Sequence, residues 1–193
     1  MNNTFLLETL ENISPLPNKI IEQLTSHLRE EHLPKKHLLL KEGQIAKRVY
    51  FIQEGLARGF FYHKKKEKTS WFRQAGDFMV SVNSFFTQSQ TTENIELVED
   101  CMLYSLSWVQ LQALYEDFPE FNLIGRVLAE KYYMRSEERA KMLRTFPAVA
   151  RYQVLMNQYP QILQRAKLGQ IASYLSISQE TLSRIRANSH STK

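Results

Sequence analysis

The sequence predicts an α+β fold in which an antiparallel β-roll is followed by one long helix and a helical C-terminal domain. Residues 33–107 consist of short apolar runs separated by glycine-containing turns, a texture that favours a roll or sandwich of antiparallel strands. After Trp108 the apolar period becomes helical, with a short segment and then a longer one from Pro119 to about Arg144. The predicted units are a roll domain, a long helix and a helical domain, with bounds at 1–118, 119–144 and 145–193.

Six apolar runs predict the strands of the roll, at residues 38–40, 49–52, 58–62, 69–72, 95–98 and 102–106. Turn signals separate them at Gly43, at Gly55, in the charged stretch 64–68 and at the Gly76-Asp77 pair. Because the runs are short and numerous, we expect them to close into a roll that leaves few strand edges exposed.

Helical segments flank the predicted roll on both sides. Ahead of it, four apolar residues at helical spacing predict a docking helix: Ile20, Ile21, Leu24 and Leu28. Behind it, the long segment carries a heptad seam of Phe121, Ile124, Leu128 and Met142, with Lys131, Arg135 and Glu138 between them. Two interpretations of this seam stay open: a helix that lies against its own domain, or a coiled coil that joins two copies of the chain.

Composition excludes several classes of protein. The 193 residues suffice for a real hydrophobic core and suit one large domain or two. No apolar run resembles a signal peptide or a membrane span, so we expect a cytoplasmic protein with no membrane partner. Cys101, the single cysteine, cannot form an internal disulfide or complete a four-cysteine metal site, and we expect it in a buried strand.

Charge is distributed unevenly along the chain. Residues 1–125 hold 13 Lys and Arg against 16 Asp and Glu, whereas residues 126–193 hold 12 against 4. Basic charge binds phosphate by releasing condensed counterions, so the C-terminal third is the part expected to face a polyanion. We interpret the lysine run 64–66, which lies outside this third, as an ordinary solvated turn between two strands.

The stretch from Leu168 to Arg186 has the spacing of a helix-turn-helix. An apolar stripe at i, i+3, i+4 and i+7 is formed by Leu168, Ile171, Ala172 and Leu175. Ala172 is small enough for two closely packed helices to cross there. Ile177 is expected to plug the turn and Ser178 to cap the second helix, while Leu182 and Ile185 face back toward the first.

With those two residues buried, the outward arc of the second helix carries only hydrogen-bonding side chains: Gln179, Glu180, Ser183, Arg184 and Arg186. Arg can grip guanine, Gln can pair with adenine and Glu can accept from cytosine, so this face has the chemistry of base reading. Ser183 and Arg186 suit phosphate contacts equally well. The sequence therefore predicts binding to double-stranded DNA.

The order of these parts, ending in GQIASYLSISQETLSRIRA, resembles the CRP/FNR family of bacterial transcription regulators over nearly the full chain, most closely its Bacteroidetes members. In the roll, KEGQIAKRVYFIQEGLARGFF and the AGDF turn resemble the family's cyclic-nucleotide-binding domain, with glycines at its characteristic turns. The resemblance implies a homodimer joined by the long helix, with recognition helices in successive major grooves of a pseudo-palindromic site. It also implies RNA polymerase as a partner.

Several residues depart from the family pattern. Glu180 and Arg184 fall where the family places base-contacting Glu and Arg, but Gln179 stands where the best-known members have Arg, which implies a different base preference. Ser176 replaces a usual turn glycine, so backbone strain is expected there. The chain ends seven residues after Arg186, which leaves the usual wing hairpin truncated and some phosphate contacts missing.

The nucleotide pocket departs further. Where the family's cyclic-AMP binders supply a Glu for the ribose and an Arg-Ser pair for the phosphate, this sequence has Ser81, Thr91 and Thr92. Ser136 on the long helix matches a hydroxyl that reaches the base, but the adjacent Glu137 would repel a phosphate. Because a buried anion needs a cation or several donors, we expect the roll not to bind cyclic AMP in the usual way. Any small-molecule effector is a different, unidentified one.

Two other functions compete with DNA binding: a cupin-like metal enzyme, and a ligand or protein interaction module without specific DNA binding. The five histidines form neither an H-x-H pair nor an H-E-x-x-H motif: His27, His32, His37, His63 and His190. No nucleophile stands in a recognised motif, so we expect no catalytic residue, no metal and no cofactor. An interaction module would lack the steep salt dependence of specific DNA binding.

Overall fold

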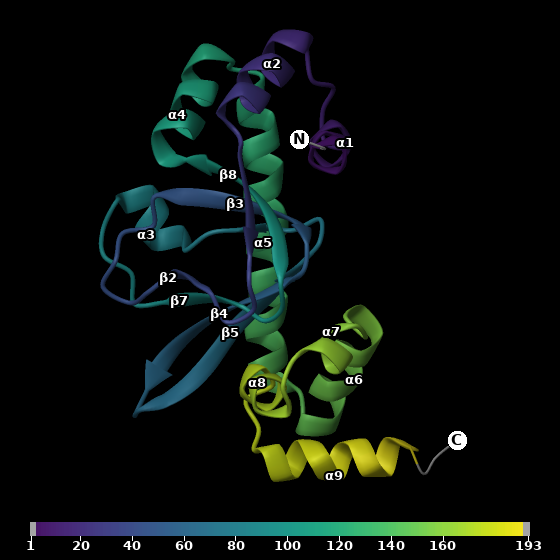
Figure 1. Ribbon diagram of the computed structural model, residues 1–193. Coiled ribbons are helices and arrows are strands. Elements are labelled where there is room, and N and C mark those ends of the chain that lie inside the picture. The colour runs from purple at the N-terminus through teal and green to yellow at the C-terminus, as the bar shows by residue number, and fades with distance from the viewer. Residues whose placement is uncertain (1–2, 191–193) are drawn as a thin grey trace.

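The structure of the protein is a computed structural model, of which residues 3–190 are described (Figure 1). A β-roll occupies one flank of a long helix, α5 (Phe121–Thr145). Helices α1 (Thr4–Glu11), α2 (Asn18–His27) and α4 (Trp108–Asp117) gather at one end of this arrangement, and α9 (Gln179–His190) crosses the other end. None of the helices in the described part of the chain is long and apolar enough to cross a membrane.

Two four-stranded antiparallel sheets form the roll. One has the order β1-β8-β3-β6 and the other β2-β7-β4-β5. The strands are β1 (Arg29–Leu33), β2 (Leu38–Leu40), β3 (Arg48–Glu54), β4 (Leu56–His63), β5 (Lys66–Gln74), β6 (Phe78–Met79), β7 (Asn94–Leu97) and β8 (Cys101–Ser107). Strands β4 and β5 make a hairpin that extends beyond the body of the roll (Figure 1).

All six predicted strands are present, but the sequence reading missed three elements. Strand β1 begins at Arg29, four residues before the predicted start of the roll, and its REEHL sequence carries no apolar signal. It forms because its backbone pairs with β8 over five residues at the edge of a sheet. Strand β6 has two residues only, and α3 (Val82–Thr87) is a single short helix, so neither is long enough to show a period.

The core lies between the sheets and under the N-terminal helices. Ile52, Leu97 and Leu103 from three strands are fully buried, and burial of such a side chain contributes about 1.5–3 kcal/mol. The predicted docking helix is confirmed as α2, with Ile20 and Leu24 buried in the same cluster. Cys101 is buried in β8 as expected.

The seam of the long helix packs against its own roll. Phe121 and Ile124 are buried in the core of the roll and Leu128 packs against it. Farther along, the guanidinium of Arg135 forms an ion pair with the Asp77 carboxylate at 2.7 Å. These seam residues therefore follow the first interpretation, in which the helix lies against its own domain. A coiled coil between two chains would have to use another stripe of the helix.

A helical module completes the chain, with α6 (Ala148–Gln158), α7 (Ile162–Arg165) and α8 (Leu168–Tyr174) ahead of α9. Helix α7 also joins the module to the roll, because Ile162 packs in one cluster with Leu56, Phe72 and Val98. The predicted truncated wing would follow α9, which ends at His190. Residues 191–193 lie outside the described range, so the truncation stays a prediction.

Candidate functional site

Helices α8 and α9 form the predicted helix-turn-helix, and the turn has the geometry that the sequence indicated. Ser176 has a φ of 54°, the left-handed conformation that a glycine usually takes, so the expected backbone strain is present. The backbone amide of Ile177 donates to the Ala172 carbonyl at 3.0 Å. The Ser178 hydroxyl accepts a hydrogen bond from the Thr181 amide at 3.1 Å, which caps α9.

A small hydrophobic core holds the two helices together. It has seven buried members: Tyr152, Leu155, Ile171, Ala172, Leu175, Leu182 and Ile185. Leu175 and Leu182 are completely buried, and Ala172 has 2% of its surface exposed in the same cluster. Because Leu182 and Ile185 face inward, the opposite side of α9 is turned away from the protein.

The outward face of α9 carries the predicted polar side chains. Gln179, Glu180, Ser183 and Arg184 are exposed, and Arg186 is half-buried. The pKa of Glu180 is held below its usual value, first of all by a hydrogen bond with the Ser178 side chain. A hydrogen bond with the Glu180 backbone amide and the nearby charge of Arg184 lower it further. Glu180 is therefore an ionised acceptor at neutral pH.

The helix-turn-helix is bound to the β4–β5 hairpin of its own roll. The Ser173 hydroxyl on α8 accepts from the Thr69 amide at 2.9 Å and donates to the Glu67 carbonyl at 3.0 Å. Tyr174, the next residue, packs against the Phe72 ring. These contacts fix α8 on the hairpin, and the sequence reading missed them because the partners lie about a hundred residues apart.

Arginines reinforce this junction. The Arg139 guanidinium from α5 lies 3.8 Å from the centre of the Tyr174 ring and donates to the Thr69 carbonyl at 3.2 Å. Arg165 on α7 forms an ion pair with Glu99 in the turn before β8. The orientation of α8 and α9 is thus set by the long helix and the roll together.

Residues of the predicted effector pocket are only partly brought together. The buried Ser81 and Thr91 hydroxyls lie 2.9 Å apart and line one cavity of about 370 Å³ with the exposed Thr92. Ser136 is exposed on α5 and does not line this cavity within one chain. Its place in the effector pocket stays a prediction.

A carboxylate that the sequence reading overlooked lies in this cavity. The indole Nε1 of Trp71 donates to Glu93 at 2.8 Å, and burial raises the pKa of Glu93 while hydrogen bonds from Trp71 and Ser81 offset part of that rise. Neither Lys nor Arg is among the described residues that line the cavity. An anionic phosphate would therefore meet a carboxylate there and no cation.

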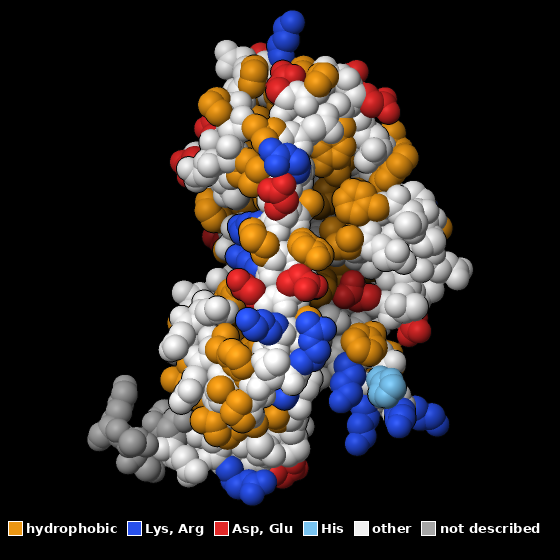
Figure 2. Space-filling model, turned by 180° about the vertical axis from the view of Figure 1, so that it is seen from behind, with side chains coloured by type: hydrophobic (Ala, Val, Ile, Leu, Met, Phe, Trp, Pro, Cys, Tyr) orange, Lys and Arg blue, Asp and Glu red, His pale blue; other side chains and the backbone are white. Residues whose placement is uncertain are grey.

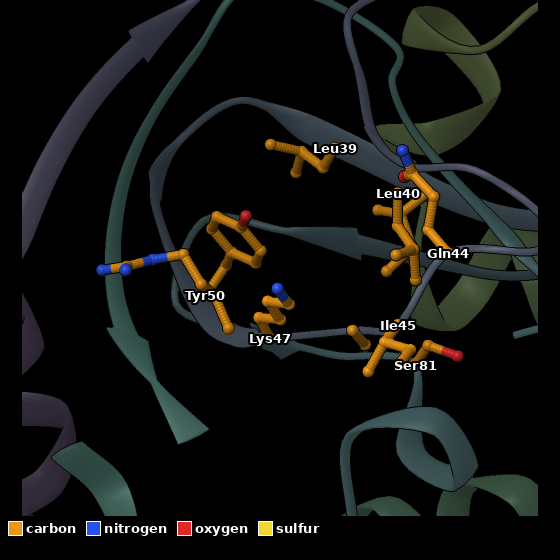
Figure 3. Close-up of a pocket in the computed structure, with 10 residues that line it drawn as sticks. Leu39, Leu40, Gln44, Ile45, Lys47, Tyr50 and Ser81 are labelled. Atoms are coloured by element: carbon orange, nitrogen blue, oxygen red, sulfur yellow. The ribbon is translucent and has the colours of Figure 1, made fainter. Parts of the chain in front are cut away.

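A second cavity of about 480 Å³ lies on the other side of Ser81 (Figure 3). Tyr50 and Lys47 lie on one side of it, and Leu40 and Gln44 on the other (Figure 3). Burial, the largest cause, raises the pKa of Tyr50, so its phenol is a neutral donor at physiological pH. Arg48 also lines this cavity, so its wall combines two basic side chains with aliphatic ones.

The turn after β5 links the cavities to the long helix. The Tyr132 hydroxyl on α5 accepts from the Phe78 amide at 2.6 Å, next to the ion pair of Asp77 with Arg135. Burial, more than the neighbouring Asp77 charge, raises the pKa of Tyr132 to about 12, so it remains protonated. A movement of this turn would displace α5, because Tyr132 and Arg135 of that helix are bound to it.

Comparison with known proteins supports the fold. Residues 30–118 match the family described as cyclic nucleotide-binding domain. No curated protein matches the chain significantly. Among solved structures, CLP, described as a c-di-GMP-responsive global regulator of Xanthomonas campestris, has 16% identity and a TM-score of 0.73, with 91% of this chain and 93% of that chain covered.

Two further structures have the same architecture. A CooA mutant from Carboxydothermus hydrogenoformans has 19% identity and a TM-score of 0.70, with 96% of this chain and 84% of that chain covered. The catabolite activator protein of Thermus thermophilus has 19% identity and a TM-score of 0.57, with 93% and 85% covered. Of these structures, CLP is described as a global regulator and the Thermus thermophilus protein is named a catabolite activator. Residues 30–118 thus match the model of the cyclic nucleotide-binding domain, and the chain shares the CRP-like fold of these solved structures.

Proposed function

We propose that this chain is a homodimeric transcription regulator that binds a specific double-stranded DNA site through α9. Its parts are a sensor roll (1–118), a dimerisation helix (119–144) and a DNA-binding domain (145–193). The single observation that carries the proposal is the division of α9 into a buried apolar side and an exposed polar side. Leu182 is fully buried, whereas Gln179, Glu180 and Arg184 are exposed together.

The exposed side suits the major groove. Arg184 can donate two hydrogen bonds to guanine, and the ionised Glu180 can accept from cytosine. The Gln179 amide lies over Gly169, where an added Cβ would come within 3.0 Å of its Nε2 atom. The glycine thus leaves room for Gln179 to lie at the start of α9, where a base edge would be read. Ser183 and the half-buried Arg186 then serve the phosphates.

A second copy of the chain would pack on the outward stripe of α5. Positions spaced four and three apart form this stripe, at Leu123, Val127, Glu130, Met134 and Glu137. Leu123 and Met134 are 39% and 57% exposed, a large apolar surface for a helix in water. Figure 2 shows charged side chains between apolar ones along this face of the molecule. The polar members would set the register of a paired helix.

Pairing of two such helices would place two copies of α9 about one turn of DNA apart, roughly 34 Å, and so select a pseudo-palindromic site. An effector in the roll would act by favouring one arrangement of the dimer over another. The Asp77–Arg135 ion pair and the Tyr132–Phe78 hydrogen bond supply the route from the cavities to α5.

Replacing Arg184 by Ala tests the proposed reading of bases. Loss of a bidentate contact to guanine is expected to cost about 1–3 kcal/mol at the cognate site and to relax one base preference. Fluorescence anisotropy with a panel of single-base variants of the site measures both effects. Lys19→Ala is the control, because Lys19 is an exposed basic residue of α2, at the end of the molecule opposite α9. Equal affinities and unchanged preferences for Arg184→Ala would exclude this role.

Cyclic AMP is expected not to bind in the usual way. The cavity beside Ser81 and Thr91 presents Glu93 to the phosphate and no described cation, so burying the anion there is unfavourable. Calorimetric titration and thermal unfolding should both be unchanged by the nucleotide. Micromolar affinity, or a rise in Tm that saturates at such concentrations, would overturn this expectation.

A further inference from the structure

The tip of the β4–β5 hairpin has an unusual backbone. His63 pairs with Lys66, so Lys64 and Lys65 alone make the turn, and their φ angles are 49° and 62°. Two successive positive φ values define a type I′ turn, for which Asn-Gly is the favoured sequence. Lysine has a Cβ that resists this conformation. The turn geometry therefore does not explain why lysine stands at both positions, and the charge of the two side chains is the property left to explain it.

The hairpin tip also concentrates positive charge that nothing in the described chain neutralises. Lys64, Lys65, Lys66 and Lys68 are all exposed, and none of them takes part in an ion pair within residues 3–190. The one carboxylate among them, Glu67, is bound at 2.6 Å by a buried arginine of β4. The surrounding residues 1–125 carry a net negative charge, so this cluster is not a consequence of overall composition.

The hairpin points toward the end of the molecule that carries α9 (Figure 1). Seen from behind, the corresponding corner bears a group of Lys and Arg side chains beside the end formed by α9 (Figure 2). Ser173 binds β5 of the hairpin, close to the turn, to α8 through two hydrogen bonds of 2.9 Å and 3.0 Å. The lysines therefore keep a fixed position relative to the helix-turn-helix.

We infer that this hairpin tip is a second DNA-contacting element, which binds the phosphates of the duplex beside the bases read by α9. The inference rests on the proposed function. Lysine ammonium groups are point charges on flexible stems, so they bind phosphates without selecting a sequence. The hairpin would thus add affinity and salt dependence, and the choice of bases would stay with α9.

The sharpest test replaces the turn by its favoured sequence, Lys64→Asn with Lys65→Gly. This change removes two charges while it relieves the strained backbone, so Tm should stay equal or rise and misfolding cannot explain a loss of binding. Each lost phosphate contact lowers the slope of log affinity against log salt by about 0.9. If two phosphate contacts are lost, the ratio of the affinity of the unaltered protein to that of the variant should be roughly tenfold larger at 50 mM salt than at 200 mM.

Two further comparisons locate the contact. Lys66→Gln with Lys68→Gln leaves the turn intact and should reproduce the loss. Lys19→Gln with Arg29→Gln removes two exposed charges at the start of α2 and of β1, away from the hairpin and α9, and should change neither affinity nor slope. On a duplex trimmed to the bases read by α9, the hairpin variants should bind as the unaltered protein does.

The outcomes separate the two proposals. Absence of selective DNA binding by the unaltered protein would remove the proposed function itself. Selective binding whose affinity and salt slope are the same in both hairpin variants would overturn the inference about the hairpin and leave the proposed function standing. Unchanged DNA binding combined with lost transcriptional activation would also overturn it, and would assign the lysines to an acidic protein partner.

Discussion

Replacing Leu182 by Ala is expected to unfold α9 locally and to abolish specific DNA binding while the roll remains folded. Leu182 is completely buried in a cluster with only seven buried members. Removing a buried leucine side chain costs about 2–5 kcal/mol, which is a large share of the stability that so small a core can supply. Since the roll has its own core, the loss should be confined to the helical module.

Hydrogen exchange followed residue by residue is the measurement for this prediction. Amides of α8 and α9 should lose protection, while those of β3 and β8 keep theirs, and DNA affinity should fall to the non-specific level. Met156→Ala is the matched control, because Met156 is a large apolar residue of the same module but is 40% exposed. Full protection of the α9 amides in the Leu182→Ala variant would contradict this prediction. It would show that the packing of Leu182 against α8 is not what keeps the polar side of α9 exposed.

Replacing Arg58 by Ala is expected to destabilise the roll by about 3–5 kcal/mol, because it leaves buried charge without its partner. Arg58 is 4% exposed and its guanidinium binds the carboxylates of Glu96 and Glu67, each at 2.6 Å. Glu96 also lies directly opposite it in the strand ladder and is mostly buried. The β4–β5 hairpin should loosen first, and the docking of α8 with it.

Denaturant unfolding of the variant measures this loss of stability. Arg29→Ala is the control, since its pair with Glu31 involves an arginine that is 64% exposed and should contribute at most about 1 kcal/mol. The double change Arg58→Met with Glu96→Met removes both charges and should recover much of the stability. If Arg58→Ala were as stable as Arg29→Ala, the buried ion pair would not be what fixes the hairpin.

The helix-turn-helix could be predicted almost completely from sequence because its determinants are local. Ala172 at the crossing, Ile177 at the turn and Ser178 at the cap lie within seven residues, and each has the structural place that its chemistry indicated. The strain predicted at Ser176 followed from the same short-range argument. Local geometry and residue preference point to one structure here, which is why the prediction holds.

Features made by distant contacts could not be predicted. The bonds of Ser173 with the hairpin and of Arg135 with Asp77 join residues that no periodic pattern relates. Strand β1 is polar and owes its existence to pairing with β8. Glu93 was missed because its significance depends on the Trp71 indole and the cavity around it. In each case the missing knowledge was which surfaces the fold brings together.

The lysine run 64–66 shows how structure changes an interpretation. In the sequence it is one charged turn among several, and solvation alone accounts for it. In the structure two of its residues adopt a conformation that lysine disfavours, and the hairpin is fastened to the helix-turn-helix. Neither the strain nor the fastening can be derived from composition, and together they give the run a role to test.

In vitro selection of DNA sites with the purified protein at physiological salt tests the central claim most directly. The predicted result is enrichment of a pseudo-palindrome whose two half-sites lie about 10 base pairs apart, as two copies of α9 on paired α5 helices would require. A pool that shows no enriched sequence after repeated rounds would contradict the assignment of this chain as a sequence-specific regulator.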